Sequence, residues 1–157
     1  MSIPVQRVVH MNLNCRDQHR SATTLRALGF NPASRLCAEP QDGAAMGIEG
    51  FVQWDGFAMV AGDSWDQAML DLLKFCLPPT IGQPYASMDH IGFHRLQLRV
   101  LDIHDAHRAL IAGGQQTFVS EVEAEFDTHH DDTSRLAFSF CDTDGIWFDV
   151  AQANDNE

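Results

Sequence analysis

Lysine is almost absent from this chain of 157 residues, since Lys74 is its single example. Acidic side chains outnumber Lys and Arg by 22 to 10, which gives a formal net charge of -12. Nucleic-acid backbones are bound by clusters of Lys and Arg, so this composition excludes nucleic acid as the expected partner. A strongly negative surface attracts cations over long distances, and cationic ligands are therefore the first to test.

Long apolar runs are missing as well. No run approaches the roughly 20 residues that span a bilayer, and residues 1–9 lack the apolar stretch of a secretory signal. We therefore expect a cytoplasmic protein without a membrane partner. A hydrophobic content of 45% with 20% charged residues excludes a disordered chain. The length fits one compact domain, or two small halves that share a core.

Paired cysteines and nucleotide-binding motifs are also absent. The chain has four cysteines and no C-x-x-C pair, and the mostly apolar neighbours of these cysteines predict buried, reduced thiols. Residues 43–47 lack the spacing of a phosphate loop, and no nucleophile elbow or dinucleotide fingerprint occurs. Phosphoryl transfer and nicotinamide chemistry therefore have no support.

Two segments, residues 8–30 and 94–114, follow the same plan of strand, helix and turn. Asp17 and Asp102 stand where a side chain caps the start of a helix, and Gly29 and Gly113 stand where a left-handed residue ends one. In each expected strand apolar and polar residues alternate, so one face packs on the helix and the other is polar. The polar faces carry His10, Asn12, Asn14, Arg95, Gln97 and Arg99.

Strand-like segments follow each expected helix. They cover residues 47–54, a turn at 55–56, then 57–61 and 68–75 in the first half, and 116–122, 135–141 and 146–152 in the second. A turn at 142–145 joins the last two. The predicted fold is α+β, with a first βαβββ module at 1–77, a linker rich in Pro and Gly at 78–92, and a second module at 93–153, together forming one compact domain.

Four segments carry a resemblance to a known family, namely His10–Asp17, Leu70–Phe75 running into Pro78, Arg95–Ile103 and Asp142–Asp149. In their order and spacing they resemble the vicinal oxygen chelate superfamily, which includes glyoxalase I, bleomycin-resistance proteins and extradiol dioxygenases. The resemblance implies two βαβββ modules that form a half-barrel cleft around a small-molecule ligand. It also implies that the cleft is completed within one chain or across a homodimer, and we expect a homodimer.

The resemblance also implies a ligand set for a metal. Metalloenzymes of this superfamily hold a metal with four residues on the first and last strands of the modules, which correspond here to His10, Asp71, Arg95 and Asp149. His10, Asp71 and Asp149 could bind Zn, Fe, Mn or Ni. Arg95 offers only hydrogen-bond donors and repels a cation. His94 could replace it only through a bulge, against the alternation of the strand.

We therefore favour a cluster without a metal, in which Arg95 bridges Asp149 or Asp71 and His10 completes the network. No cofactor is favoured, and a divalent metal is the alternative. If the protein is a metal-free enzyme, His10 is the candidate base and Arg95 the group that stabilises an enolate or oxyanion.

Candidate ligand-binding residues lie on the same faces. Trp147 alternates with Asp149 and could stack on a planar ligand, while Met69 flanks Asp71 in an apolar wall. We expect the opposite wall to be lined by polar groups for the ligand, from Asn12, Asn14, Gln97 and Arg99. Trp54 is interpreted as an ordinary core residue. His104, His107 and the tract His129-His130-Asp131-Asp132 are interpreted as solvated rather than metal-binding.

These observations predict a metal-independent small-molecule-binding protein of the glyoxalase/bleomycin-resistance type that sequesters a cationic or aromatic ligand. Two alternatives remain open. One is a metal-dependent lyase, isomerase or dioxygenase that uses His10, Asp71 and Asp149. The other is a homodimeric interaction module whose cleft no longer binds a ligand.

Overall fold

The computed structural model describes residues 7–37, 39–63, 65–87, 89–126 and 134–153. The chain divides into two compact units, Met1–Ile81 and Gly82–Glu157. Their boundary falls within the segment 78–92 that the sequence indicates as a linker, and the predicted module boundaries themselves stay predictions. The tract at residues 129–132 lies outside the described residues.

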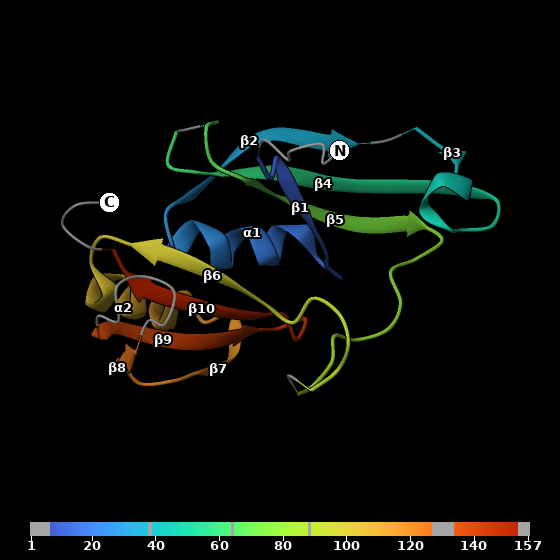
Figure 1. Cartoon of the computed structure of the whole chain (residues 1–157). Coiled ribbons are helices and arrows are strands. Elements are labelled where there is room, and N and C mark those ends of the chain that lie inside the picture. Colours follow the sequence, from blue (N-terminus) through green and yellow to red (C-terminus); the bar gives the residue numbers. More distant parts are fainter. Residues whose placement is uncertain (1–6, 38, 64, 88, 127–133, 154–157) are drawn as a thin grey trace, which may run out of the picture. The chain divides into compact units, whose positions relative to one another are not determined.

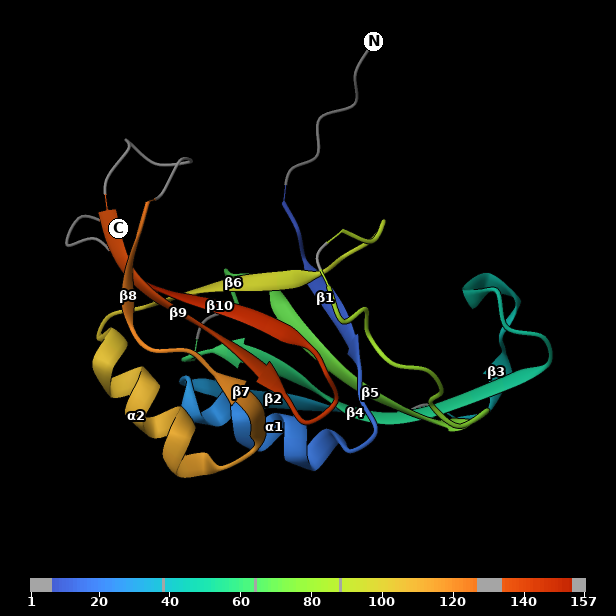
Figure 2. The ribbon, with the colours of Figure 1, turned by 90° about the horizontal axis from the view of Figure 1, so that it is seen from below.

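The first unit is a mixed sheet with one helix against it (Figure 1). Its sheet has the strand order β1-β5-β4-β2, in which β1 and β5 are parallel and the other pairs antiparallel. A short strand, β3, pairs with the start of β4, beside a single 3-10 turn at Ala44–Met46 (Figure 2). The elements are β1 (His10–Asn14), α1 (Gln18–Ala27), β2 (Phe30–Cys37), β3 (Gln41–Asp42), β4 (Phe51–Ala61) and β5 (Met69–Leu77).

The second unit repeats this topology. Its sheet has the order β6-β10-β9-β7, with β6 parallel to β10 and a short β8 paired with β9. The elements are β6 (Arg95–Val100), α2 (Ile103–Gly113), β7 (Gln116–Val119), β8 (Glu123–Phe126), β9 (Ser134–Asp142) and β10 (Trp147–Gln152). In both units the first strand pairs with the last, so the predicted α+β fold of two βαβββ modules is confirmed.

Local capping explains where the two helices begin. The carboxylate of Asp17 accepts hydrogen bonds from the backbone N–H groups of His19 and Arg20, at 3.0 and 3.1 Å. Asp102 accepts one from the N–H of Asp105 at 2.9 Å. Both caps satisfy donors that have no partner inside the helix, as the sequence predicts. The left-handed residue that ends α2 is Gly114, with φ of 62°, one position after the expected Gly113.

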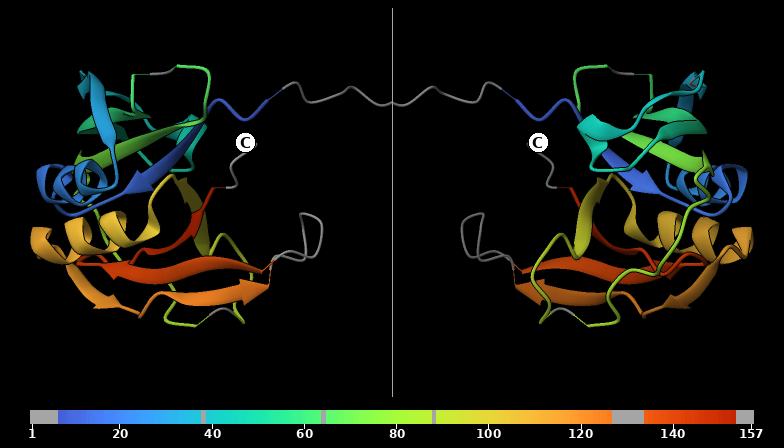
Figure 3. Two further views of the ribbon diagram at one scale, coloured as in Figure 1. Left: turned by 90° about the vertical axis from the view of Figure 1, so that its left-hand side faces the viewer. Right: turned by 90° about the vertical axis from the view of Figure 1, so that its right-hand side faces the viewer.

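Each helix packs on one face of its own sheet (Figure 3), and the alternation of the strands supplies the apolar side. In the first unit Leu25 of α1 and Leu72 of β5 are almost fully buried. In the second unit the rings of Phe140 and Phe148 stack with their centres 4.7 Å apart, and Leu110 of α2 is 1% exposed. The opposite face of each sheet is therefore left for the polar residues.

The predicted turn at residues 55–56 is wrong, because β4 runs without interruption from Phe51 to Ala61. Gly56 lies inside this strand, and a Cβ atom there would stand 1.9 Å from the carbonyl oxygen of Leu72 on β5. Glycine is needed for the close approach of two backbones and not for a turn. The strand β2 was not predicted, because Pro32 and the register shift beside it break the alternation of apolar residues.

The prediction of four buried thiols is half wrong. Cys15 and Cys141 are buried, whereas Cys37 and Cys76 are exposed. Cys37 is the last residue of β2, and Cys76 lies one position before the end of β5, so neither is covered by a helix. In the part of the chain that the structure describes, no helix is long and apolar enough to cross a membrane.

Candidate functional site

The polar face of the first sheet gathers side chains from β1 and β5. In the parallel pair of these strands His10 aligns with Met69, Asn12 with Asp71, and Asn14 with Leu73. Aligned residues of neighbouring strands point to the same side of a sheet. The amides of Asn12 and Asn14 therefore share one face with the carboxylate of Asp71, whereas the sequence analysis expected them on the opposite wall.

A cavity of about 710 Å³ opens on this face. Asn12 and Asn14 of β1 line it together with Leu73 and Phe75 of β5, and the 3-10 turn contributes Met46. A cavity of this volume is within the range that holds small organic ligands, and such sites combine apolar walls with a few polar groups. Among the described lining residues, polar groups besides the two asparagines come from the hydroxyl of Thr80 and the indole N–H of Trp54.

One wall of the cavity is the segment from Pro78 to Ile81, which Thr80 fixes to the sheet. The hydroxyl of Thr80 accepts a hydrogen bond from the backbone N–H of Phe75 at 3.0 Å and donates one to the carbonyl of Cys15 at 3.3 Å. The N–H of Thr80 also donates to the carbonyl of Phe75 at 3.2 Å. This wall is thus bonded to β5 and to Cys15, the residue that follows β1.

Trp54 is a lining residue that the sequence analysis missed. It pairs with Phe75 across β4 and β5, and the two rings lie 5.9 Å apart at an angle of 49°. The alternation around Trp54 is interrupted by a register shift between Gln53 and Trp54, so its face could not be read from its neighbours. The lining residues Met46, Gly47 and Ile48 were also missed, because residues 43–47 were tested only as a phosphate loop and the strand expected at 47–54 begins at Phe51.

His10 and Asp71 lie close together on the same face, with 3.7 Å between Nδ1 and Oδ2, and form an ion pair when His10 is protonated. The side chain of Asp71 is 14% exposed, against 51% for His10. Burial raises the pKa of the Asp71 carboxyl, and the charge of His10 opposes this rise without cancelling it. Met69 aligns with His10 but is not among the residues that line the cavity.

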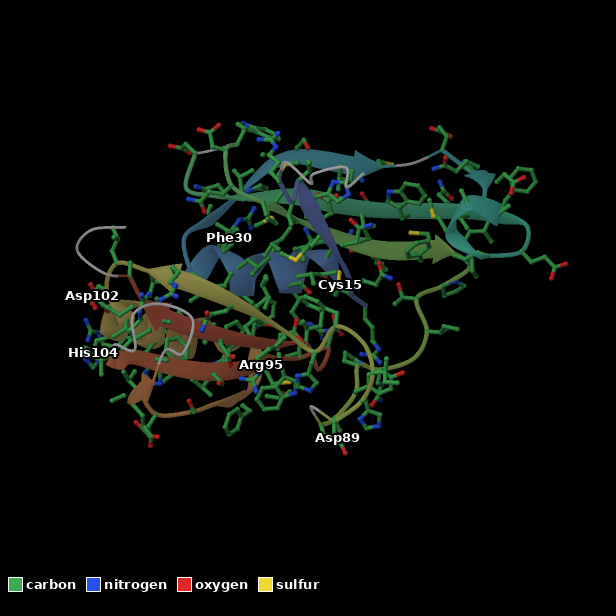
Figure 4. The ribbon with its side chains drawn as sticks, viewed as in Figure 1. Cys15, Phe30, Asp89, Arg95, Asp102 and His104 are labelled. Carbon is green, nitrogen blue, oxygen red and sulfur yellow. The ribbon has the colours of Figure 1, made fainter. Side chains whose placement is uncertain are left out.

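Arg95 and Asp149 form the corresponding pair in the second unit. Nη1 of Arg95 lies 2.5 Å from Oδ2 of Asp149, and Figure 4 labels Arg95 at the start of β6. The hydroxyl of Ser139 donates to the other oxygen, Oδ1, at 2.6 Å. Asp149 is 8% exposed, so a nearly buried carboxylate has both oxygens engaged. This is one of the two pairings for Arg95 that the sequence analysis proposed.

The two pairs occupy equivalent positions in the two modules. His10 and Arg95 each begin the first strand of a module, and each aligns with the residue two positions before the aspartate on the last strand. The pairing is therefore diagonal in both sheets, within reach of long side chains. The resemblance implies four positions for a metal, two in each unit. In each unit the two side chains at these positions contact each other.

The remaining ligand-binding candidates belong to the second unit. Trp147 shares the face of Asp149 and packs against Phe118, with 5.4 Å between the rings. Gln97 and Arg99 are exposed on this face. A smaller cavity of about 250 Å³ in this unit is lined by Ser120, Ser139 and neighbouring residues, but not by these three. Their predicted role in binding stays a prediction.

The donor set does not fit a metal at the positions of the second unit. Arg95 has no lone pair to offer, and both oxygens of Asp149 are already hydrogen-bonded. Among the described residues, no group of three His, Cys, Asp or Glu side chains could hold a metal ion. The bulge that would bring His94 into the place of Arg95 does not occur, because β6 and β10 pair without a register shift from Arg95 to Val100.

The interpretation of His107 as a solvated residue is wrong. Its Nε2 atom lies 2.9 Å from the carbonyl oxygen of Ser120, and its ring packs edge-on against Phe138 at 5.0 Å. His107 therefore lies on the side of α2 that faces its sheet. His104, labelled in Figure 4, is exposed.

No protein-family model matches this chain, and no curated protein matches it by sequence. Solved structures do match its fold. A glyoxalase family protein from Bacillus cereus is 20% identical, with a TM-score of 0.72 over 96% of this chain and 95% of that one. A bleomycin-binding protein in complex with bleomycin is 17% identical, with a TM-score of 0.52 over 96% and 100% of the two chains.

A further match is TnmS3, an antibiotic-binding protein from Streptomyces sp. CB03234. It is 18% identical, with a TM-score of 0.52, and the match covers 98% of this chain and 100% of that chain. These likenesses extend over nearly the whole length of each protein and include the duplicated module. The chain therefore has the fold of the glyoxalase/bleomycin-resistance proteins of the vicinal oxygen chelate superfamily, as its sequence motifs predict.

Proposed function

We propose that this protein binds an aromatic small molecule in the cavity of its first module, that it does so without a metal, and that it sequesters the molecule rather than transforms it. The observation that carries the proposal is the 710 Å³ cavity with its apolar walls and its few polar groups. A site of this composition buries most of an organic ligand and orients it by a few hydrogen bonds.

Two aromatic side chains in the cavity wall indicate that the ligand is aromatic. Trp54 and Phe75 line the cavity at an angle of 49° to each other, so a planar molecule that stacks on one ring meets the other at its edge. Both arrangements are favourable for aromatic pairs. Two neighbours of the same fold are described as binding bleomycin or an antibiotic, which supports a binding role. The choice of ligand depends on the residues that line the cavity in this chain.

We propose binding without a metal because the side chains at the candidate metal positions do not form a suitable set of ligands. A metal-dependent lyase, isomerase or dioxygenase would need Asp149 as a ligand together with His10 and Asp71. Asp149 is instead held by Arg95 and Ser139. No specific observation favours this alternative, and we do not propose it. The predicted homodimer and the predicted cytoplasmic location stay predictions.

Binding is tested by titrating the protein with a panel of aromatic compounds, including bleomycin, and following tryptophan fluorescence and the melting temperature. The Trp54→Ala variant should bind aromatic compounds about tenfold more weakly, because the ligand loses its stacking partner. Trp65→Ala is the matched control, because Trp65 is 55% exposed and does not line the cavity. The ligand should be recovered unchanged by mass spectrometry after prolonged incubation.

Three results would contradict the proposal. If no aromatic compound changes the fluorescence or the melting temperature, the cavity is not a binding site. Equal affinities of the Trp54→Ala and Trp65→Ala variants would place the ligand elsewhere. A chemically altered ligand would show that the protein is an enzyme and would overturn sequestration.

A further inference from the structure

Among the described residues, those that line the first-module cavity include no ionisable side chain. The polar groups are the amides of Asn12 and Asn14, the hydroxyl of Thr80 and the indole N–H of Trp54, and the other lining residues are apolar or glycine. Moving a charged group from water into such surroundings costs free energy unless an opposite charge meets it there. An ionised ligand would find no counter-charge among these lining residues.

Charged residues that neighbour the cavity in sequence point elsewhere or are already paired. Lys74 lies between Leu73 and Phe75 on β5, so the alternation of the strand turns it to the other face. Asp55 follows Trp54 and is bound by two nitrogens of Arg35, at 3.0 and 3.1 Å. Asp71 is paired with His10. None of the three side chains lines the cavity.

The two asparagines supply a hydrogen-bonding edge. Asn12 and Asn14 are two residues apart on β1, which places them about 7 Å apart on one face. Each amide presents a donor and an acceptor side by side. Within the described ranges neither amide has a hydrogen-bond partner in the protein, and both residues are exposed toward the cavity they line. A ligand edge with an acceptor next to a donor matches such a group.

From these features we infer that the ligand is an uncharged planar molecule with an amide-like edge, such as a lactam or a carboxamide on an aromatic ring. This inference rests on the proposed binding function. The net charge of -12 attracts cations over long distances, but physiological salt screens such attraction beyond about 8 Å. The lining of the cavity, rather than the charge of the whole chain, therefore selects the ligand.

The test compares four probes that share one ring system: 1-naphthamide, 1-naphthoate, 1-naphthylmethylammonium and naphthalene. Calorimetric titration of the full chain at neutral pH and physiological salt should give 1-naphthamide at least about a tenfold higher affinity than either ion. Asn12→Ala and Asn14→Ala should each weaken the binding of 1-naphthamide about fivefold and leave naphthalene unchanged. Asn31→Ala is the control, because the Asn31 amide donates to the carbonyl of Gly62 instead.

Each outcome separates the inference from the function on which it rests. If either ion binds as tightly as 1-naphthamide, or if the Asn12 and Asn14 variants behave like Asn31→Ala, the inference is overturned and aromatic binding stands. If none of the four probes binds, naphthalene included, both the inference and the proposed function are contradicted.

Discussion

Nη1 of Arg95 lies 2.5 Å from Oδ2 of Asp149, and the pair joins the first residue of β6 to the middle of β10. His10 and Asp71 take the same diagonal positions in the first module, at 3.7 Å. Each module thus pairs the first residue of its first strand with an aspartate two positions beyond the aligned residue of its last strand.

Removing the negative charge of Asp149 should destabilise the protein. In Asp149→Asn the guanidinium of Arg95, whose side chain is 33% exposed, loses its counter-ion in a partly buried setting. Its partial exposure reduces the cost below that of a fully buried pair, to about 1–3 kcal/mol in the free energy of unfolding. Urea denaturation measures it.

A control and a second variant sharpen this prediction. Asp63→Asn changes an exposed aspartate and should alter stability by less than about 0.5 kcal/mol. The double variant Arg95→Met with Asp149→Leu should recover most of the loss, because apolar residues often replace a buried pair without cost. If Asp149→Asn leaves the free energy of unfolding unchanged, the Arg95–Asp149 pair does not stabilise the folded protein.

Metal ions should not stabilise the protein. Saturation of a specific site at one hundred times its Kd adds about 2.7 kcal/mol of stability, which raises the Tm of a chain of this size by about 5–10 °C. We expect no such shift in a melting curve with excess Zn²⁺, Mn²⁺ or Ni²⁺, and no drop in Tm with a chelator. A rise of that size would show that the folded chain binds a metal, and its loss in His10→Ala or Asp149→Ala would locate the metal at these residues.

The pH dependence of stability should reveal Asp71. Because burial raises the pKa of Asp71 above its ordinary value of 3.8, the folded state holds this proton more tightly than the unfolded state. Stability is then lost as the pH rises from about 3.8 to the raised pKa. The free energy of unfolding of Asp71→Asn, relative to that of the unchanged protein, should therefore increase across this pH window and stay constant above it.

Asp55 provides a comparison of opposite sign. The hydrogen bonds from Arg35 hold the pKa of Asp55 below 3.8, so its contribution to stability is present at neutral pH and is lost as the pH falls through the lowered pKa. The loss of unfolding free energy in Asp55→Asn, relative to the unchanged protein, should therefore disappear at acidic pH. Denaturation curves of both variants over a series of pH values measure the two trends, and parallel trends would refute the assignment of Asp71.

Gly56 should tolerate no side chain. In Gly56→Ala the new Cβ would meet the carbonyl oxygen of Leu72 at 1.9 Å, which forces β4 and β5 apart and costs about 3 kcal/mol or more. Gly62 has φ of +57° and no atom within 4 Å of a Cβ placed there, so Gly62→Ala isolates the backbone strain, at about 1–2 kcal/mol. Equal losses in thermal unfolding would argue against the close approach.

Features that depend on local chemistry were predicted from the sequence. Asp17 and Asp102 cap helices through bonds to residues two or three positions away, and strict alternation placed Asn12, Asn14 and Asp149 on the correct faces. The resemblance to a known superfamily added the order of the modules. It also raised the conflict at Arg95, whose ion pair with Asp149 follows from the chemistry of the two side chains.

Features that depend on pairing between distant segments could not be predicted. Trp54 lines the cavity because β4 aligns it with Phe75, and no periodicity within either strand encodes this alignment. In the sequence, Asp55 and Gly56 resemble a turn. The need for glycine at position 56 comes from the carbonyl of Leu72, which lies next to it only in the folded sheet. His107 was assigned to solvent because its contacts, Ser120 and Phe138, belong to later segments of the chain.

The most direct test of the account is a nuclear magnetic resonance titration of the side-chain amides of Asn12 and Asn14 with 1-naphthamide in the presence of a metal chelator. The account predicts that both amide signals shift in a saturable manner, and that the Trp54→Ala variant needs about tenfold more ligand for the same shift. Signals that stay in place, or that move only after a divalent metal is added, would contradict metal-free binding of 1-naphthamide in the first-module cavity.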